Sequence, residues 1–278
     1  MTLLSLIVVV LLERLVQVTE TFHYRHYFNW YQDKVQSVLK KSESVSAEVF
    51  LLIWLAIPAV SVAVVQLLLG TGVLGLLFSI FILFLCYGCP QHRVCYKQYL
   101  EAACRGDQEA CYLYGEKLGQ KFNKGSKETL GQTLVWINFR HYFAVIFWFV
   151  VLGAAGAVFY VFSRNLAKQS LQKDNLRWLA RPSNRLLAIL VWLPARITGF
   201  AFLFVGHFSR ALPTWLNGLT RCDLDARTYI TDIADKAEDV SCPEHDYLTE
   251  PCVLLKLAKR AFLFLLSIIA IFTITGIL

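Results

Sequence analysis

Three polar side chains that could bind an anion stand in one apolar stretch of this chain. The segment WINFRHYFAVIFW, residues 136–148, has the composition of a membrane helix but contains Asn138, Arg140 and His141. A charge at bilayer depth costs at least ~2.5–3.5 kcal/mol on the insertion scale. Because arginine stays protonated, Arg140 must meet an acid, backbone carbonyls, water or an anionic ligand.

A second arginine, Arg196, lies near the middle of the apolar segment 185–207. A guanidinium group suits carboxylate or phosphate because its N–H groups form a planar fork. On a helix Asn138 and His141 share a face, and Arg140 can converge with them on one cavity. We therefore expect these four side chains to line a polar pocket within the membrane that binds an anionic small ligand.

Simpler explanations exist for each of these residues. Arg140 can extend to the membrane interface, with Asn138 as a hydrogen-bonding contact between helices and His141 as an interfacial donor. That explanation fits Arg196 less well, because it has apolar residues on both sides and a longer reach to water. Glu13, just past the first apolar segment, is the nearest expected internal counter-ion.

Two further residues are ligand-binding candidates with an interfacial alternative. His207 lies where an apolar run meets polar chain, so it suits interfacial packing as well as a binding or basic role. Trp148 suits a membrane-interface belt as well as ligand stacking. No residue is assigned a catalytic role.

Composition indicates a membrane protein. Of the 278 residues, 56% are hydrophobic and 17% are charged, beyond the usual range of soluble domains on both counts. The net charge of +7 could suggest nucleic acid, but beside long apolar stretches it is better explained by charge asymmetry across a bilayer. The predicted partner is therefore the lipid bilayer and not nucleic acid.

The cysteines raise the question of a metal site, most sharply in CYGCPQHRVC, residues 86–95. This stretch holds a Cys-x2-Cys pair, His92 and a third thiol. Zinc fingers and ribbons need a second paired knuckle at a set distance, and none follows. The sequence therefore predicts reduced thiols and no metal.

Apolar runs and breaks predict an all-α fold, a polytopic membrane helical bundle with broken or re-entrant helices and cytoplasmic helical segments. Residues 49–69 and 73–88 form a helical hairpin around a short uncharged turn. The run 134–162 is too long for one span and is expected to bend at its GAAG sequence, while Pro194 is expected to break the segment 185–207.

The same reading gives the organisation of the chain. Residues 1–278 are predicted to form a single membrane domain, in which 91–132 is a cytoplasmic helical hairpin insertion and 209–258 a cytoplasmic loop region. Basic residues cluster in the loops, so the positive-inside tendency places those loops in the cytoplasm.

Three blocks resemble a known family. TLVWINFRHYFAVIFW, VWLPARITGFAFLFVGH and ALPTW are similar to the corresponding blocks of the AmpE family, as is the start of the chain through LLERL. These are multi-pass inner-membrane proteins encoded beside the AmpD amidase in Gram-negative bacteria and linked to β-lactamase regulation. The resemblance implies a role in signalling and antibiotic resistance.

WLPARIT and IFW also resemble a wider family, the CobD/CbiB membrane enzymes of cobalamin biosynthesis, which form an amide with ATP. The acidic blocks of those enzymes are replaced here, so the oxygen ligands expected for magnesium are missing. The residues at those positions are Trp136, Arg140 and His141 in the first block, Arg164 and Ala167 in the second, and Leu187 and Ala188 in the third.

We therefore expect a membrane sensor or signalling modulator in the cell-wall and β-lactam response, whose anionic ligand is a nucleotide or a cell-wall fragment. Two alternatives remain. One is an amide-ligase-like enzyme that uses acids such as Glu101, Asp107, Asp223 or Asp225. The other is a transporter, because broken helices and intramembrane arginine occur in that class. No cofactor is assigned beyond a candidate nucleotide, and assembly into a homo-oligomer is left open.

Overall fold

The computed structural model describes residues 2–15, 24–39, 46–70, 72–120, 128–221, 224–238 and 248–276. Every regular element in these residues is a helix, which confirms the predicted all-α fold. Contacts divide the chain into two compact units. One comprises Met1–Gly88 and Ala144–Val191 with Leu278, and the other comprises Cys89–Phe143 and Trp192–Ile277. The organisation as one membrane domain stays a prediction.

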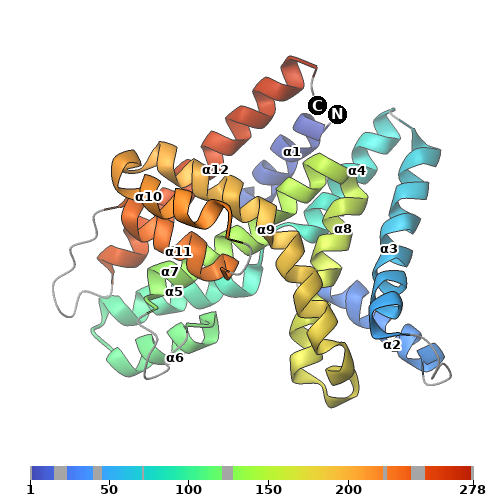
Figure 1. The fold of residues 1–278 in the computed structure, drawn as a ribbon, viewed down its shortest axis with the longest axis horizontal. Helices are drawn as coiled ribbons and strands as arrows, with labels where there is room; N and C mark the ends of the chain where they lie inside the picture. Colours follow the sequence, from blue (N-terminus) through green and yellow to red (C-terminus); the bar gives the residue numbers. More distant parts are fainter. Residues whose placement is uncertain are drawn as a thin grey trace. The chain divides into compact units, whose positions relative to one another are not determined.

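The first unit is built around α8 (Ala144–Gln172). The predicted hairpin is present, because α3 (Ala47–Leu69) packs against α4 (Val73–Cys86), and both pack on α8 (Figure 1). Further elements are α1 (Thr2–Leu15), α2 (Tyr24–Leu39), the 3₁₀-helix η3 (Asp174–Leu179) and the first part of α9 (Ala180–Val205).

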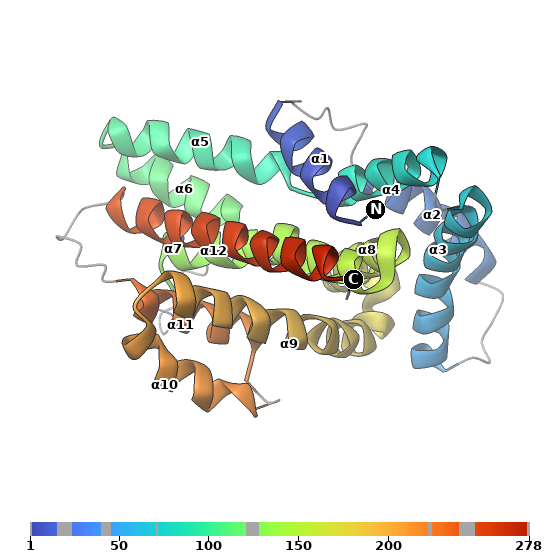
Figure 2. The same ribbon diagram turned by 90° about the horizontal axis from the view of Figure 1, so that it is seen from above.

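The second unit is built around α7 (Leu130–Asn138), which packs against α11 (Ala226–Ala237) and α12 (Thr249–Ile274). The predicted helical hairpin in residues 91–132 consists of α5 (Pro90–Cys104) and α6 (Gln108–Leu118), which lie side by side (Figure 2). The polar region 209–258 contains α10 (Phe208–Leu219) and α11. These two helices pack against each other.

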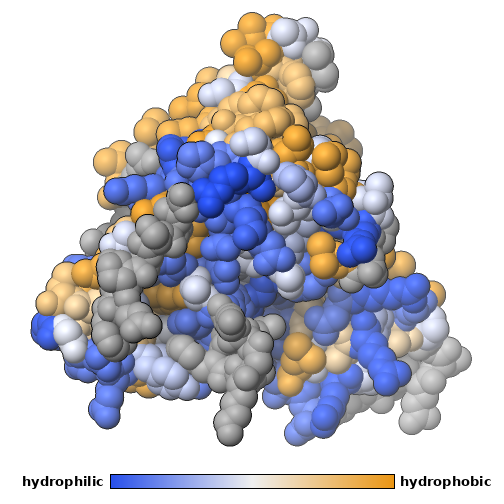
Figure 3. Space-filling view, turned by 60° about the vertical axis from the view of Figure 1, so that its left-hand side comes forward, coloured by the Kyte–Doolittle hydropathy of each residue, from blue (hydrophilic) through white to orange (hydrophobic). Residues whose placement is uncertain are grey.

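Several helices have the length and composition of membrane spans. Among the described residues four helical stretches qualify, or five if the broken pair α4 and α5 is one span. In α3 and α12 only 22% and 17% of the apolar window is buried, so most of their apolar side chains need a nonaqueous environment. Figure 3 shows hydrophobic surface at the top, where α12 ends in Figure 1. The chain is therefore a multi-pass membrane protein.

The predicted bend in the run 134–162 is confirmed. Gly153 interrupts α8 with φ +67° and ψ −157°, a conformation that residues with a Cβ rarely adopt. Past the kink the backbone comes so close that a Cβ at Gly156 would collide with the carbonyl oxygen of Trp148 and with Leu152. Two glycines thus allow one long apolar run to turn.

The predicted break at Pro194 is wrong, because α9 continues through this residue as one helix. Proline has no N–H, so in a helix the carbonyl four residues earlier loses its donor. That carbonyl belongs to Leu190, and it accepts a hydrogen bond from Nε1 of Trp148 at 3.1 Å. The tryptophan of α8 therefore replaces the missing backbone donor, and α9 stays helical.

The role of Trp148 as the replacement hydrogen-bond donor is testable with two variants. We expect Trp148→Phe to destabilise the protein by about 1 kcal/mol beyond its loss of packing, because the Leu190 carbonyl then has no replacement donor. In a Pro194→Ala background the alanine N–H can reach that carbonyl, so Trp148→Phe should cost less there. A double-mutant cycle of unfolding in detergent measures this difference, and equal costs in the two backgrounds would contradict the assignment.

Candidate functional site

The polar residues 138–141 lie where the regular α-helix stops. Asn138 ends α7 and donates from Nδ2 to the carbonyl oxygen of Leu134 at 2.9 Å. The next five residues, Phe139–Phe143, form the π-helix η2, which contains Arg140 and His141. A π-helical turn holds more residues than an α-helical turn, so the angles between neighbouring side chains differ from those of the predicted regular helix. Such turns occur frequently at functional sites.

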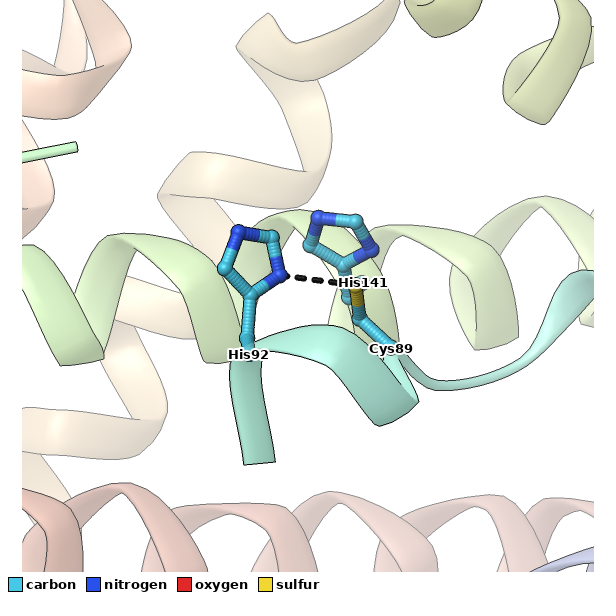
Figure 4. A group of neighbouring side chains, drawn as sticks. All are labelled: Cys89, His92 and His141. Carbon is cyan, nitrogen blue, oxygen red and sulfur yellow. Dashed lines mark hydrogen bonds between the residues drawn. The ribbon is translucent and has the colours of Figure 1, made fainter. Parts of the chain in front are cut away.

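His141 lies beside Cys89, the N-cap residue of α5, and His92 in the first turn of this helix, as Figure 4 shows. Its ring centroid is 5.1 Å from that of His92, and Nδ1 of His92 is 2.7 Å from Sγ of Cys89. One ligand atom from each of the three side chains lies within 4.8 Å of the others. Cys89 and His141 are buried, at 2% and 8% exposure. The fold thus joins one predicted site residue to a thiol and an imidazole of another helix.

Arg196 is buried, with 4% of its surface exposed, and protein groups surround its guanidinium. Nη2 donates to the carbonyl oxygens of Gly218 at 3.0 Å and Arg221 at 2.6 Å. The guanidinium carbon lies 4.7 Å from the ring centroid of Trp192 and 4.6 Å from that of Tyr229. These contacts connect α9 with the end of α10 and with α11.

The surroundings of this arginine are also organised by hydrogen bonds. Nε1 of Trp215 donates to the carbonyl oxygen of Arg196 at 3.2 Å, and the hydroxyl of Tyr229 donates to the carbonyl oxygen of Trp215 at 3.3 Å. Burial raises the pKa of Tyr229 to about 12, and the charge of Arg196 opposes this rise only in part. The phenol therefore stays protonated and keeps its role as a donor at neutral pH.

The remaining predicted residues are His207, Trp148 and Glu13. His207 is exposed and precedes α10, where its backbone N–H donates to the carbonyl oxygen of Ala237 at 2.8 Å. Trp148 belongs to the first unit, and so does Glu13, whose carboxylate lies beside Gly88. The assignment of these residues to a ligand pocket stays a prediction.

The acids considered for a ligase-like enzyme include several with structural contacts. Asp107 caps α6 by accepting from the N–H of Ala110 at 3.0 Å, and Asp225 precedes α11. Glu101 lies 4.0 Å from Lys97 on an exposed face of α5. Asp223 lies outside the described residues.

Sequence reasoning missed a polar cluster at the start of α7. The carboxylate of Glu250, on α12, accepts from the hydroxyl of Thr129 and from the N–H of Gly131 at 3.1 Å. Thr129 and Gln132 form a capping box, a pattern that the sequence could have revealed. Nearby, the guanidinium of Arg227 pairs with Glu128 at 2.6 Å, and these long-range contacts have no local sequence signal.

The hydrogen bonds and ring contacts of Arg196 predict that its removal destabilises the protein. We expect Arg196→Ala to lower the free energy of unfolding by about 2 to 4 kcal/mol, because two carbonyls lose a charged donor and two rings lose a stacked cation. Arg196→Lys keeps the charge but not the planar fork, so it should recover only part of this loss. Unfolding in detergent measures the stability of both variants. If Arg196→Ala is as stable as the wild type, the structural role of Arg196 is contradicted.

The cap on α7 gives a further stability prediction. Glu250→Gln removes a negative charge from the positive end of the helix dipole and should cost about 0.5–2 kcal/mol. Glu101→Gln is the matched control, because its exposed carboxylate should change stability by less than about 0.5 kcal/mol. Equal effects of the two substitutions on the melting temperature would exclude a capping role for Glu250.

Comparison with known proteins gives the chain a family. The family model described as regulatory signalling modulator protein AmpE matches residues 1–278. Protein AmpE of Shigella flexneri is 28% identical over a 298-residue alignment that covers all of both chains. A 74-residue segment is 35% identical to the cobalamin biosynthesis protein CobD of Chromobacterium violaceum and covers 26% of this chain and 24% of that protein. No solved structure matches. By its match over the whole length, this multi-pass helical membrane protein belongs to the AmpE family of regulatory signalling modulators.

Proposed function

We propose that the protein is an inner-membrane sensor that modulates signalling in the cell-wall and β-lactam response by binding an anionic small ligand. The observation that carries this proposal is the match to the AmpE signalling family over residues 1–278. The chain also keeps permanent cations within its apolar helices, where an anion is a strong partner for arginine. A nucleotide and a cell-wall fragment are the two candidate ligands.

The proposed topology places the basic loops in the cytoplasm. The connection between α8 and α9 carries Lys173 and Arg177, and α12 begins its apolar part after Lys259 and Arg260. Such residues are retained on the cytoplasmic side of bacterial inner membranes. A ligand made in the cytoplasm would then reach the sensor without crossing the bilayer.

Arg140 is the residue that we assign to the ligand. Its side chain is partly exposed, whereas that of Arg196 is 4% exposed and donates to backbone carbonyls. Arg140 also lies in the π-helical turn next to Asn138, whose amide can add a neutral hydrogen bond. In this proposal Arg140 binds the anion, and Arg196 holds the surrounding helices in place.

The division between the two arginines predicts different outcomes for their removal. We expect Arg140→Ala to weaken binding of an anionic probe at least ~10-fold, since a charged hydrogen bond contributes ~1.5–3 kcal/mol. Calorimetry of purified protein with ATP, and separately with a muramyl peptide, measures the affinity.

The matched control is Arg177→Ala, which removes an arginine with 82% of its side chain exposed and should leave binding unchanged. Equal affinity of the wild type and Arg140→Ala for a probe that binds would refute the role of Arg140. The ATP experiment is repeated with magnesium, because magnesium-dependent turnover would favour the ligase-like enzyme instead. In cells that lack the native protein, Arg140→Ala should fail to restore the normal level of β-lactamase induction.

A further inference from the structure

We propose that Cys89, His92 and His141 form a zinc-binding site. All three belong to the second unit, and one ligand atom from each lies within 4.8 Å of the others (Figure 4). The inference is independent of the proposed ligand, because it depends only on the identity and placement of these side chains.

The spacing of the ligand atoms suits zinc after small side-chain rotations. With Zn–S near ~2.3 Å and Zn–N near ~2.0–2.1 Å, neighbouring ligands of a tetrahedral ion lie ~3.3–3.6 Å apart. The observed Cys89 to His92 separation is 2.7 Å, and the largest separation within the set is no more than 4.8 Å. The required spacing is longer than the 2.7 Å contact and shorter than the 4.8 Å limit, so small side-chain rotations can supply it.

The backbone holds the ligands on regular elements. Cys89 is the N-cap residue of α5, Pro90 occupies the start of this helix, and His92 follows within its first turn. His141 comes from the π-helix between α7 and α8. Metal sites are more precise when helices carry their ligands, since the protein then has little backbone to order on binding.

The donor set selects the class of metal. Magnesium and calcium prefer oxygen ligands, whereas one thiolate and two imidazoles suit zinc and its softer neighbours. Three protein ligands with a fourth position for water are typical of zinc sites that interact with further molecules. The charge of one thiolate leaves a zinc complex with net positive charge, which would favour an anionic fourth ligand.

A hydrogen-bonded cysteine and histidine could also be a nucleophile and its base. Burial speaks against this alternative, because Cys89 is only 2% exposed and a substrate would have to reach its sulfur. A nucleophilic pair would also leave the adjacent His141 unexplained, whereas a metal site uses all three side chains.

The test begins with the wild-type protein, purified in detergent through a tag without histidine. We expect about one zinc per chain by elemental analysis, and a higher melting temperature with zinc than after chelation. Replacing zinc by Co²⁺ should produce the visible bands of a tetrahedral ion and a thiolate-to-cobalt charge-transfer band in the near ultraviolet.

Cys89→Ser, His92→Ala and His141→Ala should each weaken metal binding at least ~100-fold, because even outer-shell changes cost ~10–100-fold. The matched controls are Cys95→Ser, a thiol on the same helix, and His207→Ala, an exposed histidine. Both controls should keep the wild-type zinc content and the cobalt spectrum.

Two results would overturn the site. One is wild-type protein that takes up no stoichiometric zinc or cobalt on reconstitution. The other is a cobalt complex without a thiolate band, or one that persists in Cys89→Ser. Because the spectrum is recorded on the wild type, the inference remains testable even if a variant does not fold. Wild-type protein that binds the anionic probe but no zinc would refute the metal site alone, and wild-type protein that binds zinc but no anionic probe would refute the proposed ligand alone.

Discussion

Polar groups inside apolar helices must find their partners within the protein, because lipid offers no hydrogen bonds. This constraint explains several long-range contacts of the described residues. The guanidinium of Arg196 donates to the carbonyls of Gly218 and Arg221, and the indole of Trp148 donates to the carbonyl that Pro194 leaves without a backbone donor. Each contact joins segments that are distant in sequence, so satisfying a polar group also fixes how helices pack.

The same constraint gives physical meaning to the blocks that carry the family resemblance. WLPARIT supplies Trp192 and Arg196, which stack together, and ALPTW supplies Trp215, which donates to the backbone of Arg196. IFW ends in Trp148, whose indole N–H donates a hydrogen bond to the carbonyl oxygen of Leu190 in α9. These blocks therefore maintain the packing of α9. The partial similarity to a cobalamin biosynthesis protein, over 26% of this chain, carries no argument for shared chemistry.

The candidate functional groups lie at the irregular helical segment η2. The π-helix η2 places Arg140 and His141 within one turn, next to a buried thiol and a second imidazole. In our proposals Arg140 binds an anion and the three side chains Cys89, His92 and His141 hold a metal ion, and both sites would suit recognition of an anionic ligand. A signalling protein needs such recognition, because a ligand shifts a conformational equilibrium only through its different affinities for the two states.

The sequence by itself determined the features that depend on local pattern. Runs of apolar residues specified the hairpin of α3 and α4, and the glycines around Gly153 specified the bend in α8, because hydrophobicity and backbone freedom act within a few residues. Tertiary structure alone decided that α9 continues through Pro194, since the replacement donor Trp148 lies 42 positions before the Leu190 carbonyl that it satisfies. It also decided that His141 meets Cys89 and His92, because residues that two separate helices bring together have no fixed spacing along the chain.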